Sequence, residues 1–374
     1  MKQAGPRLDA SFLRTPTGWP YLLAPLIPVA LALDLAGAPA TAVFAASALG
    51  IIPTAALMGR ATEELAARSG PGIGGLLNVT FGNAPELIIA LFALGQGLQE
   101  VVKASIVGSI IGNMLLVLGA AMLAGGIGQD KQHFSRTSAS IQTTMLMLAS
   151  GALIMPAIFE LVEGKGLPQP GSEATHYGGT VEHLSLAVAV VLIVTYVIGL
   201  FFSLKTHRDL FNPEYEDEDT WGWSTRTSVI ALAIAGVLVG VMSEVLVGSI
   251  TEASESIGLS EFFIGVIVVA IVGNAAEHWV AVLVATKDKM DLAVNIAVGS
   301  SAQVALFVAP VLVIASYFIG SYPLALVFNG FELGAILLAI LVGNHVTADG
   351  ESTWFEGVQL LAVYFVFALA FYFA

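Results

Sequence analysis

Long apolar stretches, each about as long as a membrane-crossing helix, follow one another along most of the chain. A helix needs about 20 largely apolar residues to cross a bilayer, because backbone amides inside the bilayer find no partner outside the helix. Mostly short polar turns separate eleven such stretches. Their ranges are 19–37, 41–67, 73–95, 101–127, 138–159, 181–204, 226–250, 261–285, 290–317, 323–343 and 354–373. The pattern predicts an all-α polytopic membrane protein with 11 transmembrane helices.

The first stretch has a second interpretation. It follows Arg14 and ends in Gly-Ala-Pro-Ala at residues 37–40, which resembles a signal-peptide cleavage site. The apolar run is long for a signal sequence and the next stretch follows almost at once, so we expect the helix to be retained.

Composition agrees with a membrane protein and removes several kinds of chemistry. Of the 374 residues, 56% are hydrophobic and only 11% are charged, whereas soluble domains have about 25% charged residues. The chain has no cysteine, which excludes disulfides, thiolate zinc sites, iron–sulfur clusters and a cysteine nucleophile. The net charge of −14 argues against nucleic acid and favours a cation as the partner.

Positive residues lie mostly on one side of the predicted helices. With the N-terminus in the cytoplasm, 12 of the 14 Lys and Arg residues are cytoplasmic, and only Lys103 and Lys165 lie outside. Cytoplasmic loops are enriched in Lys and Arg. We therefore expect an integral membrane protein with a cytoplasmic N-terminus and an outside C-terminus, and the short loops suit a prokaryotic plasma membrane.

The chain contains an internal repeat. At a shift of 191 residues, Gly-Asn-Ala-Pro-Glu at 82–86 (the first motif) matches Gly-Asn-Ala-Ala-Glu at 273–277 (the second motif). Val-Gly-Ser at 107–109 matches 298–300 at the same shift. Five predicted helices separate the copies, so the second copy has the opposite direction in the membrane. Inverted repeats of this kind build the midplane site of many secondary transporters.

Two acidic residues lie near the middle of apolar stretches. Glu86 and Glu277 occupy a position where a charge costs at least about 2.5 to 3.5 kcal/mol. Asn83 and Asn274 precede them by three residues, so amide and carboxylate share one helix face in each copy. A single glutamate could simply hold two helices together, but a repeated pair favours a ligand site.

The first motif also contains residues that weaken a helix. Gly82 and Gly273 lower helix stability, and Pro85 removes an amide that would bond the carbonyl of Phe81, which makes this carbonyl a candidate ligand. The second motif has Ala276 in place of the proline. We therefore expect the two copies to be unequally unwound.

The next predicted helices carry further candidate ligands. Ser109 and Asn113 are four residues apart, and Ser300 and Gln303 are three apart, so each pair can face the same centre. Small and polar residues also pack helices together in membranes. Both roles remain open, and the Gly-Ser pairs suit close helix approach in either case.

The candidate ligands are hard oxygens, which Ca²⁺ accepts in flexible sets of six to eight. Softer metals normally recruit imidazole or thiolate. His278 adjoins Glu277 but points about 100° away on a helix, which favours packing or proton handling. Two protons neutralise the two buried carboxylates as well as one Ca²⁺ does, so the two loads compete for one site. Such competition predicts an antiporter in which Ca²⁺ is the transported ion and no cofactor is needed.

Other acidic residues have less certain roles. Glu244 and Glu332 lie within apolar stretches, and Glu332 nearly matches Gln142 of the first half. Each is either a proton relay or gate, or a paired structural acid. The cytoplasmic loop contains an acidic run that either is simply solvated or senses Ca²⁺. Its members are Glu214, Glu216, Asp217, Glu218 and Asp219. The loop at 160–180 reads as a connector.

The doubled Gly-Asn-Ala-x-Glu block resembles the paired signature of the Ca²⁺/H⁺ antiporter (CAX) family, within the cation/Ca²⁺ exchanger superfamily. The resemblance covers nearly the whole chain and extends to residues 108–113, 299–303, 331–332 and 354–357 and to the acidic loop. It implies Glu86 and Glu277 as shared Ca²⁺ and H⁺ ligands, and Ca²⁺ export driven by inward proton flow.

The resemblance also implies a domain plan of one extra helix followed by two inverted five-helix repeats. The expected ranges are 1–40 for the N-terminal tail and extra helix, 41–204 for the first repeat, 205–225 for the cytoplasmic acidic loop and 226–374 for the second repeat. The sequence leaves the oligomeric state open.

Two other functions were weighed against H⁺-coupled exchange. Na⁺-coupled members of the superfamily usually carry more hydroxyl and acidic ligands where this chain has Asn113 and Gln303, which favours H⁺ here. A cation channel needs a pore ringed by acids, typically from several subunits, and the inverted duplication in one chain disfavours it. The apolar stretches contain no hydrolase motif, so no enzyme is predicted.

Overall fold

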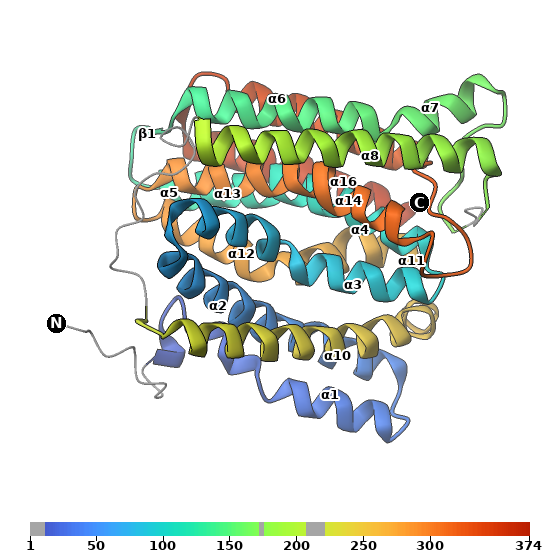
Figure 1. The fold of residues 1–374 in the computed structure, drawn as a ribbon, viewed down its shortest axis with the longest axis horizontal. Helices are drawn as coiled ribbons and strands as arrows, with labels where there is room; N and C mark the ends of the chain where they lie inside the picture. The colour runs from blue at the N-terminus through green and yellow to red at the C-terminus, as the bar shows by residue number, and fades with distance from the viewer. Residues whose placement is uncertain (1–11, 172–175, 207–220) are drawn as a thin grey trace. The chain divides into compact units, whose positions relative to one another are not determined.

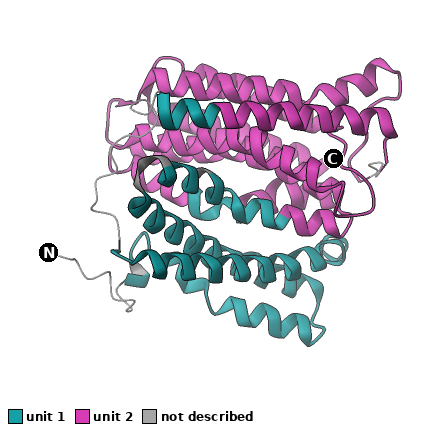
Figure 2. Cartoon of the chain, viewed as in Figure 1, with its two compact units in different colours: residues 1–89, 199–257, 272–277 teal, residues 90–198, 258–271, 278–374 magenta. Residues whose placement is uncertain are grey.

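The computed structural model describes residues 12–171, 176–206 and 221–374, and this part of the chain is almost entirely helical (Figure 1). The acidic run expected to be solvated or to sense Ca²⁺ lies outside the described residues. Figure 2 shows two compact units, each made of segments distant in sequence. Unit 1 comprises residues 1–89, 199–257 and 272–277, and unit 2 comprises 90–198, 258–271 and 278–374.

Unit 1 is built around two long helices, α2 (Ala40–Gly82) and α10 (Thr225–Ile257), which pack along each other. Helix α1 (Leu26–Leu35) packs on α2 as well. Met58 of α2 forms an apolar core with Ala235 and Val239 of α10. The smaller elements of the unit are the 3₁₀ turns η1 (Phe12–Arg14) and η2 (Trp19–Leu23) and the π turn η4 (Phe202–Thr206).

Unit 2 contains most of the remaining helices. Its elements are α4 (Gln99–Ile111), η3 (Gly112–Val117), α5 (Leu118–Gly126), α6 (Arg136–Leu153), α7 (Met155–Val162), α11 (Glu261–Phe263), η6 (Ile264–Val269), α13 (Met290–Gln303), η7 (Val304–Val308), α14 (Ala309–Ala315), α15 (Gly330–Val346) and α16 (Trp354–Phe373). Within the unit α4 packs on η6, α6 on α13, and α5 on α16. Here η3, η6 and η7 are π turns inside longer helices.

Three helices pass from one unit to the other. They are α3 (Ala84–Gly95), α8 (Gly179–Phe201) and α12 (Ala270–Ala285). In α3 the passage follows Ile89, and in α12 the residues 272–277 belong to unit 1 while the residues on either side belong to unit 2. Both motifs therefore lie in unit 1.

The helices agree closely with the predicted membrane spans. In the described part of the chain eight helices are long and apolar enough to cross a membrane, or nine if the bent pair Ile73–Gly82 and Ala84–Gly95 is one span. Two shorter apolar segments, Trp19–Leu35 and Gly330–Val346, match the first and tenth predicted spans. Apolar side chains such as Val194 and Ile198 of α8 are more than half exposed, as expected for a surface that faces lipid.

Helix α2 contains two predicted spans rather than one. A Cβ at Gly74 would lie 2.6 Å from the carbonyl oxygen of Ala66, although eight residues of straight helix cover about 12 Å. The chain therefore turns back between these residues, even though its hydrogen bonds stay helical throughout. The predicted division into 41–67 and 73–95 agrees with this turn.

The tenth predicted span begins too early in the sequence. Residues 324–328 are fully buried but not helical, and α15 begins only at Gly330. Side chains satisfy the backbone of this buried segment. Ser316 Oγ accepts from the Leu324 amide at 2.7 Å, Ser185 Oγ accepts from the Leu326 amide at 3.0 Å, and Lys103 Nζ donates to the Val327 carbonyl at 2.8 Å.

The two Lys residues assigned to the outer side of the membrane differ in exposure. Lys103 is fully buried within α4 of unit 2, and the bond to the Val327 carbonyl, together with the ring of Tyr177 at 5.3 Å, explains how its ammonium group is accommodated. The Lys165 side chain is half exposed. The side of the membrane on which they lie stays a prediction.

Unit 2 also contains a small two-stranded ribbon, which the hydropathy pattern does not indicate. Strand β1 (Gln132–His133) pairs antiparallel with β2 (Glu351–Ser352), and the Phe134 amide donates to the Gly350 carbonyl at 2.9 Å. An ion pair between Lys131 and Glu351 supports the ribbon. It joins the loop before α6 to the loop before α16.

Candidate cation site

The first motif interrupts a helix, as the sequence predicted. Helix α2 ends at Gly82, Asn83 has non-helical backbone angles (φ −91°, ψ 11°), and α3 begins at Ala84. The two helical pieces meet at an angle of 42°. Pro85 is the second residue of α3, where a missing amide is harmless. The Phe81 carbonyl accepts a hydrogen bond from the Asn83 amide, so it is not the unbonded oxygen that the proline suggested, although its second lone pair can still serve a ligand.

The second motif lies in an unbroken helix. Helix α12 runs from Ala270 to Ala285 through Gly273 and Glu277, and the π turn η6 precedes it. The glycine alone does not end the helix. This result confirms that the two copies are unequally unwound, with the proline as the deciding difference.

Each motif places its glycine against the glutamate of the other motif. A Cβ built on Gly82 would lie 2.8 Å from Glu277 Oε1, and a Cβ built on Gly273 would lie 3.2 Å from Glu86 Cγ. Both distances are shorter than ordinary van der Waals contact, so a side chain at either glycine would require the opposite glutamate to move. Within unit 1 the two glutamates are therefore held at the place where the two motifs meet.

The amide of the second motif bonds the acid of the first. Asn274 Nδ2 donates a hydrogen bond to Glu86 Oε1. Asn83, Glu86 and Asn274 are all at least nine-tenths buried, and Glu277 is half buried. The structure thus brings Glu86, Asn274 and Glu277 to the place where the two motifs meet in unit 1, and Asn83 is buried next to Gly82 in the chain.

The charge of this cluster is limited to its two carboxylates. Among the described residues, no three His, Asp or Glu side chains gather in a way that could hold a metal ion. Two acids with neutral oxygens suit a hard divalent cation or two protons, and they lack the imidazole or thiolate that softer metals select.

The remaining candidate ligands lie in unit 2. Ser109 and Ser300 are buried on α4 and α13. Asn113 lies in the π turn η3, and its Oδ1 is 3.0 Å from His278 Nε2. Since an amide oxygen only accepts, the ring nitrogen donates this bond. Hydrogen bonding of His278 agrees with a packing role, and the parts that Ser109, Asn113, Ser300 and Gln303 play in a cation site stay predictions.

The Gly-Ser pairs allow close helix approach, as expected. A Cβ on Gly108 would lie 2.1 Å from the Val266 carbonyl oxygen, and a Cβ on Gly299 would lie 2.9 Å from Gln142 Oε1. A π turn follows shortly after each pair, at Gly112–Val117 and at Val304–Val308. Shifting the first turn by 191 residues gives 303–308. Hydropathy carries no signal for these turns.

The other intramembrane acids have different environments. Glu332 was expected near the middle of a span, but it lies in the first turn of α15 and is fully buried. It forms a capping box with Asn329, in which Glu332 Oε2 accepts from the Asn329 amide at 2.8 Å. This contact favours the structural interpretation. Glu244, on α10, has an exposed side chain.

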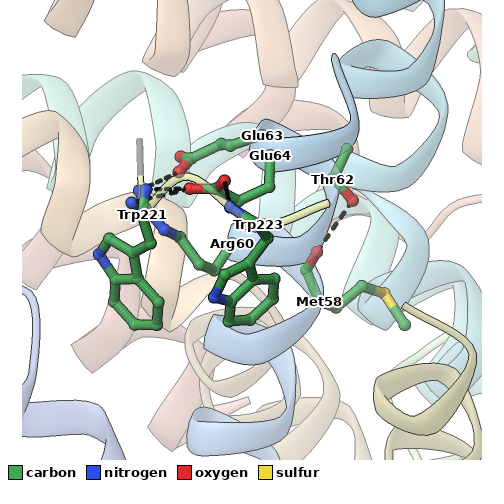
Figure 3. Close-up of polar contacts among 7 residues, drawn as sticks. All are labelled: Met58, Arg60, Thr62, Glu63, Glu64, Trp221 and Trp223. Carbon is green, nitrogen blue, oxygen red and sulfur yellow. Dashed lines mark hydrogen bonds and ion pairs between the residues drawn. The ribbon is translucent and has the colours of Figure 1, made fainter. Parts of the chain in front are cut away.

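A buried polar cluster in unit 1 was not predicted (Figure 3). Glu64 of α2 is 1% exposed, pairs with Arg60 at 3.1 Å, and accepts hydrogen bonds from the backbone amides of Trp221 and Trp223, the latter at 2.9 Å. The Arg60 guanidinium also lies 4.4 Å from the Trp221 ring centre. The i, i+4 spacing of Arg60 and Glu64 was the available signal. The cluster holds the segment just before α10 to α2.

Comparisons with known proteins agree with these features. Residues 39–205 and again 227–373 match the family described as sodium/calcium exchanger protein. A Ca²⁺/H⁺ antiporter of Synechocystis is 45% identical over 368 residues, covering 92% of this chain and 95% of the relative. A Ca²⁺/H⁺ antiporter of Bacillus subtilis is 42% identical over 356 residues, covering 94% and 97%.

A solved structure agrees as well. The structure of native YfkE superimposes with a TM-score of 0.80 at 40% sequence identity, covering 95% of this chain and all of that one. On the family match and the identity to these relatives, the chain belongs to the sodium/calcium exchanger protein family, among its Ca²⁺/H⁺ antiporters.

Proposed function

We propose that this protein is a secondary active antiporter that exchanges cytoplasmic Ca²⁺ for external H⁺ at a site formed by Glu86 and Glu277. The observation that carries the proposal is the meeting of the two motifs, in which each glycine lies against the opposite glutamate and Asn274 bonds Glu86. The names of the relatives, which are Ca²⁺/H⁺ antiporters, support the choice of ions.

The proposed coupling follows from charge balance. Two carboxylates buried among apolar helices must be neutralised, either by one divalent cation or by two protons. Asn83 and Asn274 add neutral oxygens that a Ca²⁺ ion can coordinate. Because one Ca²⁺ ion and two protons neutralise the same two acids, the site holds either the Ca²⁺ ion or the protons. If the empty site changed sides, two uncompensated negative charges would remain in the membrane. Exchange is then favoured over leakage.

The proposed topology has eleven spans in two inverted repeats after one extra helix, with alternating access between them. Three observations support it. The two segments that match the family, 39–205 and 227–373, nearly coincide with the expected repeats. The π turns η3 and η7 recur at almost the repeat shift. Counting the two shorter apolar segments as spans gives eleven.

Contacts between loops of unit 2 support the proposed orientation. Loops expected in the cytoplasm contact one another, since β1 pairs with β2 and Gln132 bonds Asp288 at 3.2 Å. Loops expected outside do the same, since the Gly171 amide donates to Glu100 at 2.7 Å and Tyr317 Oη donates to the Glu182 carbonyl at 3.1 Å. Together with the distribution of Lys and Arg, the proposed orientation has a cytoplasmic N-terminus in a plasma membrane.

The experiment is ⁴⁵Ca²⁺ uptake into proteoliposomes under an imposed pH gradient and, separately, an imposed Na⁺ gradient. We expect only the pH gradient to drive uptake, and Glu86→Gln and Glu277→Gln to abolish it. Glu252→Gln removes an exposed acid of α10 and serves as the control. Uptake driven by Na⁺ would replace H⁺ as the coupling ion, and uptake under neither gradient would overturn the substrate assignment.

A further inference from the structure

Helices α6 and α13 of unit 2 contact each other through polar side chains. Gln142 Nε2 on α6 lies 2.5 Å from Asn295 Oδ1 on α13, and Ser138 Oγ lies 3.0 Å from the same oxygen. Gln142 Nε2 also bonds Ser138 Oγ at 3.2 Å. Inside a membrane, Ser, Asn and Gln side chains hydrogen-bond across helices and hold them together, and their neutral polar groups can also order water. We call Ser138, Gln142 and Asn295 the polar file.

The polar file has an acceptor directed along α13. Gln142 is 8% exposed, and its Oε1 is buried without a hydrogen-bond partner among the described residues. This oxygen faces Gly299, where a Cβ would lie only 2.9 Å away. Asn295, Gly299 and Gln303 are spaced by four residues, so they form one stripe on α13. Along α13, the oxygen thus lies between Asn295 of the polar file and the turn of the helix that contains Ser300 and Gln303.

The other end of the polar file reaches the surface. The Ser135 amide at the start of α6 donates to Asp291 at the start of α13, in an exposed contact. This end adjoins Lys287 and Lys289, which the charge distribution assigns to the cytoplasm. From Asp291 to Gln303 the helix rises about 18 Å, more than half of a hydrocarbon core of about 30 Å.

The first repeat has no such polar stripe. At the shift of 191 residues, Ala104, Gly108 and Gly112 correspond to Asn295, Gly299 and Gln303. They pack by close approach, with a Cβ on Gly108 only 2.1 Å from the Val266 carbonyl oxygen. Small residues therefore suffice to pack this helix in one copy. The two copies thus differ in this stripe, although α4 also contains a buried polar residue, Lys103, which bonds the Val327 carbonyl.

We propose that the polar file is a water-lined path that conducts protons between the cytoplasm and the depth of Ser300 and Gln303, separate from the route of Ca²⁺. The proposal rests on the proposed H⁺-coupled exchange. Hydroxyl and carboxamide groups are neutral, so they can order waters without holding a divalent cation, which needs carboxylates. Each step passes one proton from one water to the next.

The test compares two modes of transport in the same proteoliposomes. Uptake of ⁴⁵Ca²⁺ driven by a pH gradient requires proton movement, whereas ⁴⁵Ca²⁺/Ca²⁺ self-exchange at equal pH requires none. We expect Gln142→Leu to lower pH-driven uptake by about tenfold and to leave self-exchange within about twofold of wild type. Gln142→Glu keeps the length of the side chain, but a carboxylate cannot donate the bond to Asn295 Oδ1, so it should restore uptake only at a pH low enough to protonate it.

The matched control is Thr143→Val on the same helix. Thr143 is buried, but its Oγ1 bonds the Ala139 carbonyl of its own helix at 2.9 Å. Both transport modes should stay unchanged in this variant. If Gln142→Leu loses both transport modes equally, Gln142 serves packing alone. If it loses self-exchange together with Ca²⁺ affinity, Gln142 belongs to the cation site. If its pH-driven uptake is unchanged, Gln142 has no role in proton movement. Each of these results overturns the proposal.

Failure of the proposed function gives a different result. If the wild type shows self-exchange but no uptake under a pH gradient, the proposed H⁺ coupling is wrong, and the proposed proton path is wrong as well. A loss seen only in Gln142→Leu concerns the polar file alone.

Discussion

Asn274 of the second motif donates its side-chain hydrogen bond to Glu86 of the first motif. In this contact, the glutamate of the first motif is oriented by the amide of the second motif. A carboxylate that already accepts one bond has a fixed direction for its remaining lone pairs. In the proposed site, this pairing would orient Glu86 toward the cation, and it links the first motif to the second.

Removing this amide should weaken cation binding. We expect Asn274→Ala to raise the Ca²⁺ concentration for half-maximal uptake by about tenfold, since a charged hydrogen bond contributes about 1.5 to 3 kcal/mol. Ser249→Ala is the control, because Ser249 is buried in unit 1 but bonds only the Leu246 carbonyl of its own helix, at 2.8 Å. An unchanged Ca²⁺ dependence in Asn274→Ala would contradict the assigned role.

A side chain at either motif glycine should displace the opposite glutamate. Gly82→Ala places a methyl group 2.8 Å from Glu277 Oε1, and Gly273→Ala places one 3.2 Å from Glu86 Cγ. We expect uptake to fall strongly in the first variant and less in the second. Gly59→Ala, also on α2, meets no atom within 4 Å and should keep activity while favouring the helix by up to about 1 kcal/mol. Equal activity in all three would show that the close approaches are unimportant.

The cluster around Glu64 should matter for stability. Glu64→Gln removes the charge that holds Arg60 and the amides of Trp221 and Trp223 (Figure 3). We expect a loss of roughly 2 to 3 kcal/mol, measured as a lower thermal unfolding midpoint in detergent. Glu63→Gln is the matched control, because Glu63 also pairs with Arg60 at 3.1 Å but its side chain is half exposed, so it should cost under about 1 kcal/mol.

Glu332 should affect folding more than transport. Its capping box with Asn329 survives in Glu332→Gln, because a neutral amide oxygen still accepts the Asn329 amide. We expect pH-driven uptake to keep its rate and pH profile in this variant, and Glu332→Ala to lose about 1 kcal/mol of stability. A shifted pH profile in Glu332→Gln would restore the proton-relay interpretation.

Much of the fold follows from hydropathy and helix-breaking residues. The apolar stretches predicted the helices within a few residues, and Pro85 predicted the break that Asn83 now marks. Residues 324–328 explain the main error. They are as apolar as a helix, and only the distant side chains of Ser316, Ser185 and Lys103 make their extended backbone tolerable. Hydropathy contains no information on such partners.

The site was predictable in its residue types but not in its pairing. The repeat indicated that Glu86 and Glu277 belong together. It did not indicate that each glycine lies against the opposite acid, because that contact depends on how two helices cross. The π turns were equally hidden, since an extra residue in a helical turn leaves the apolar pattern almost unchanged.

Unit 1 is interleaved in sequence, and this has a consequence for its synthesis. Helix α2 ends at Gly82 and its partner α10 begins at Thr225, so roughly 140 residues emerge between them. At about 5 to 20 residues per second, the ribosome needs roughly 7 to 30 s for that length. During this time the α10-facing side of α2 is uncovered, and Glu64 lacks the amides of Trp221 and Trp223 that it binds in the finished protein. The newly made protein thus passes through a stage in which membrane-inserted polar groups await their partner, the period when an insertase or a protease can act on it.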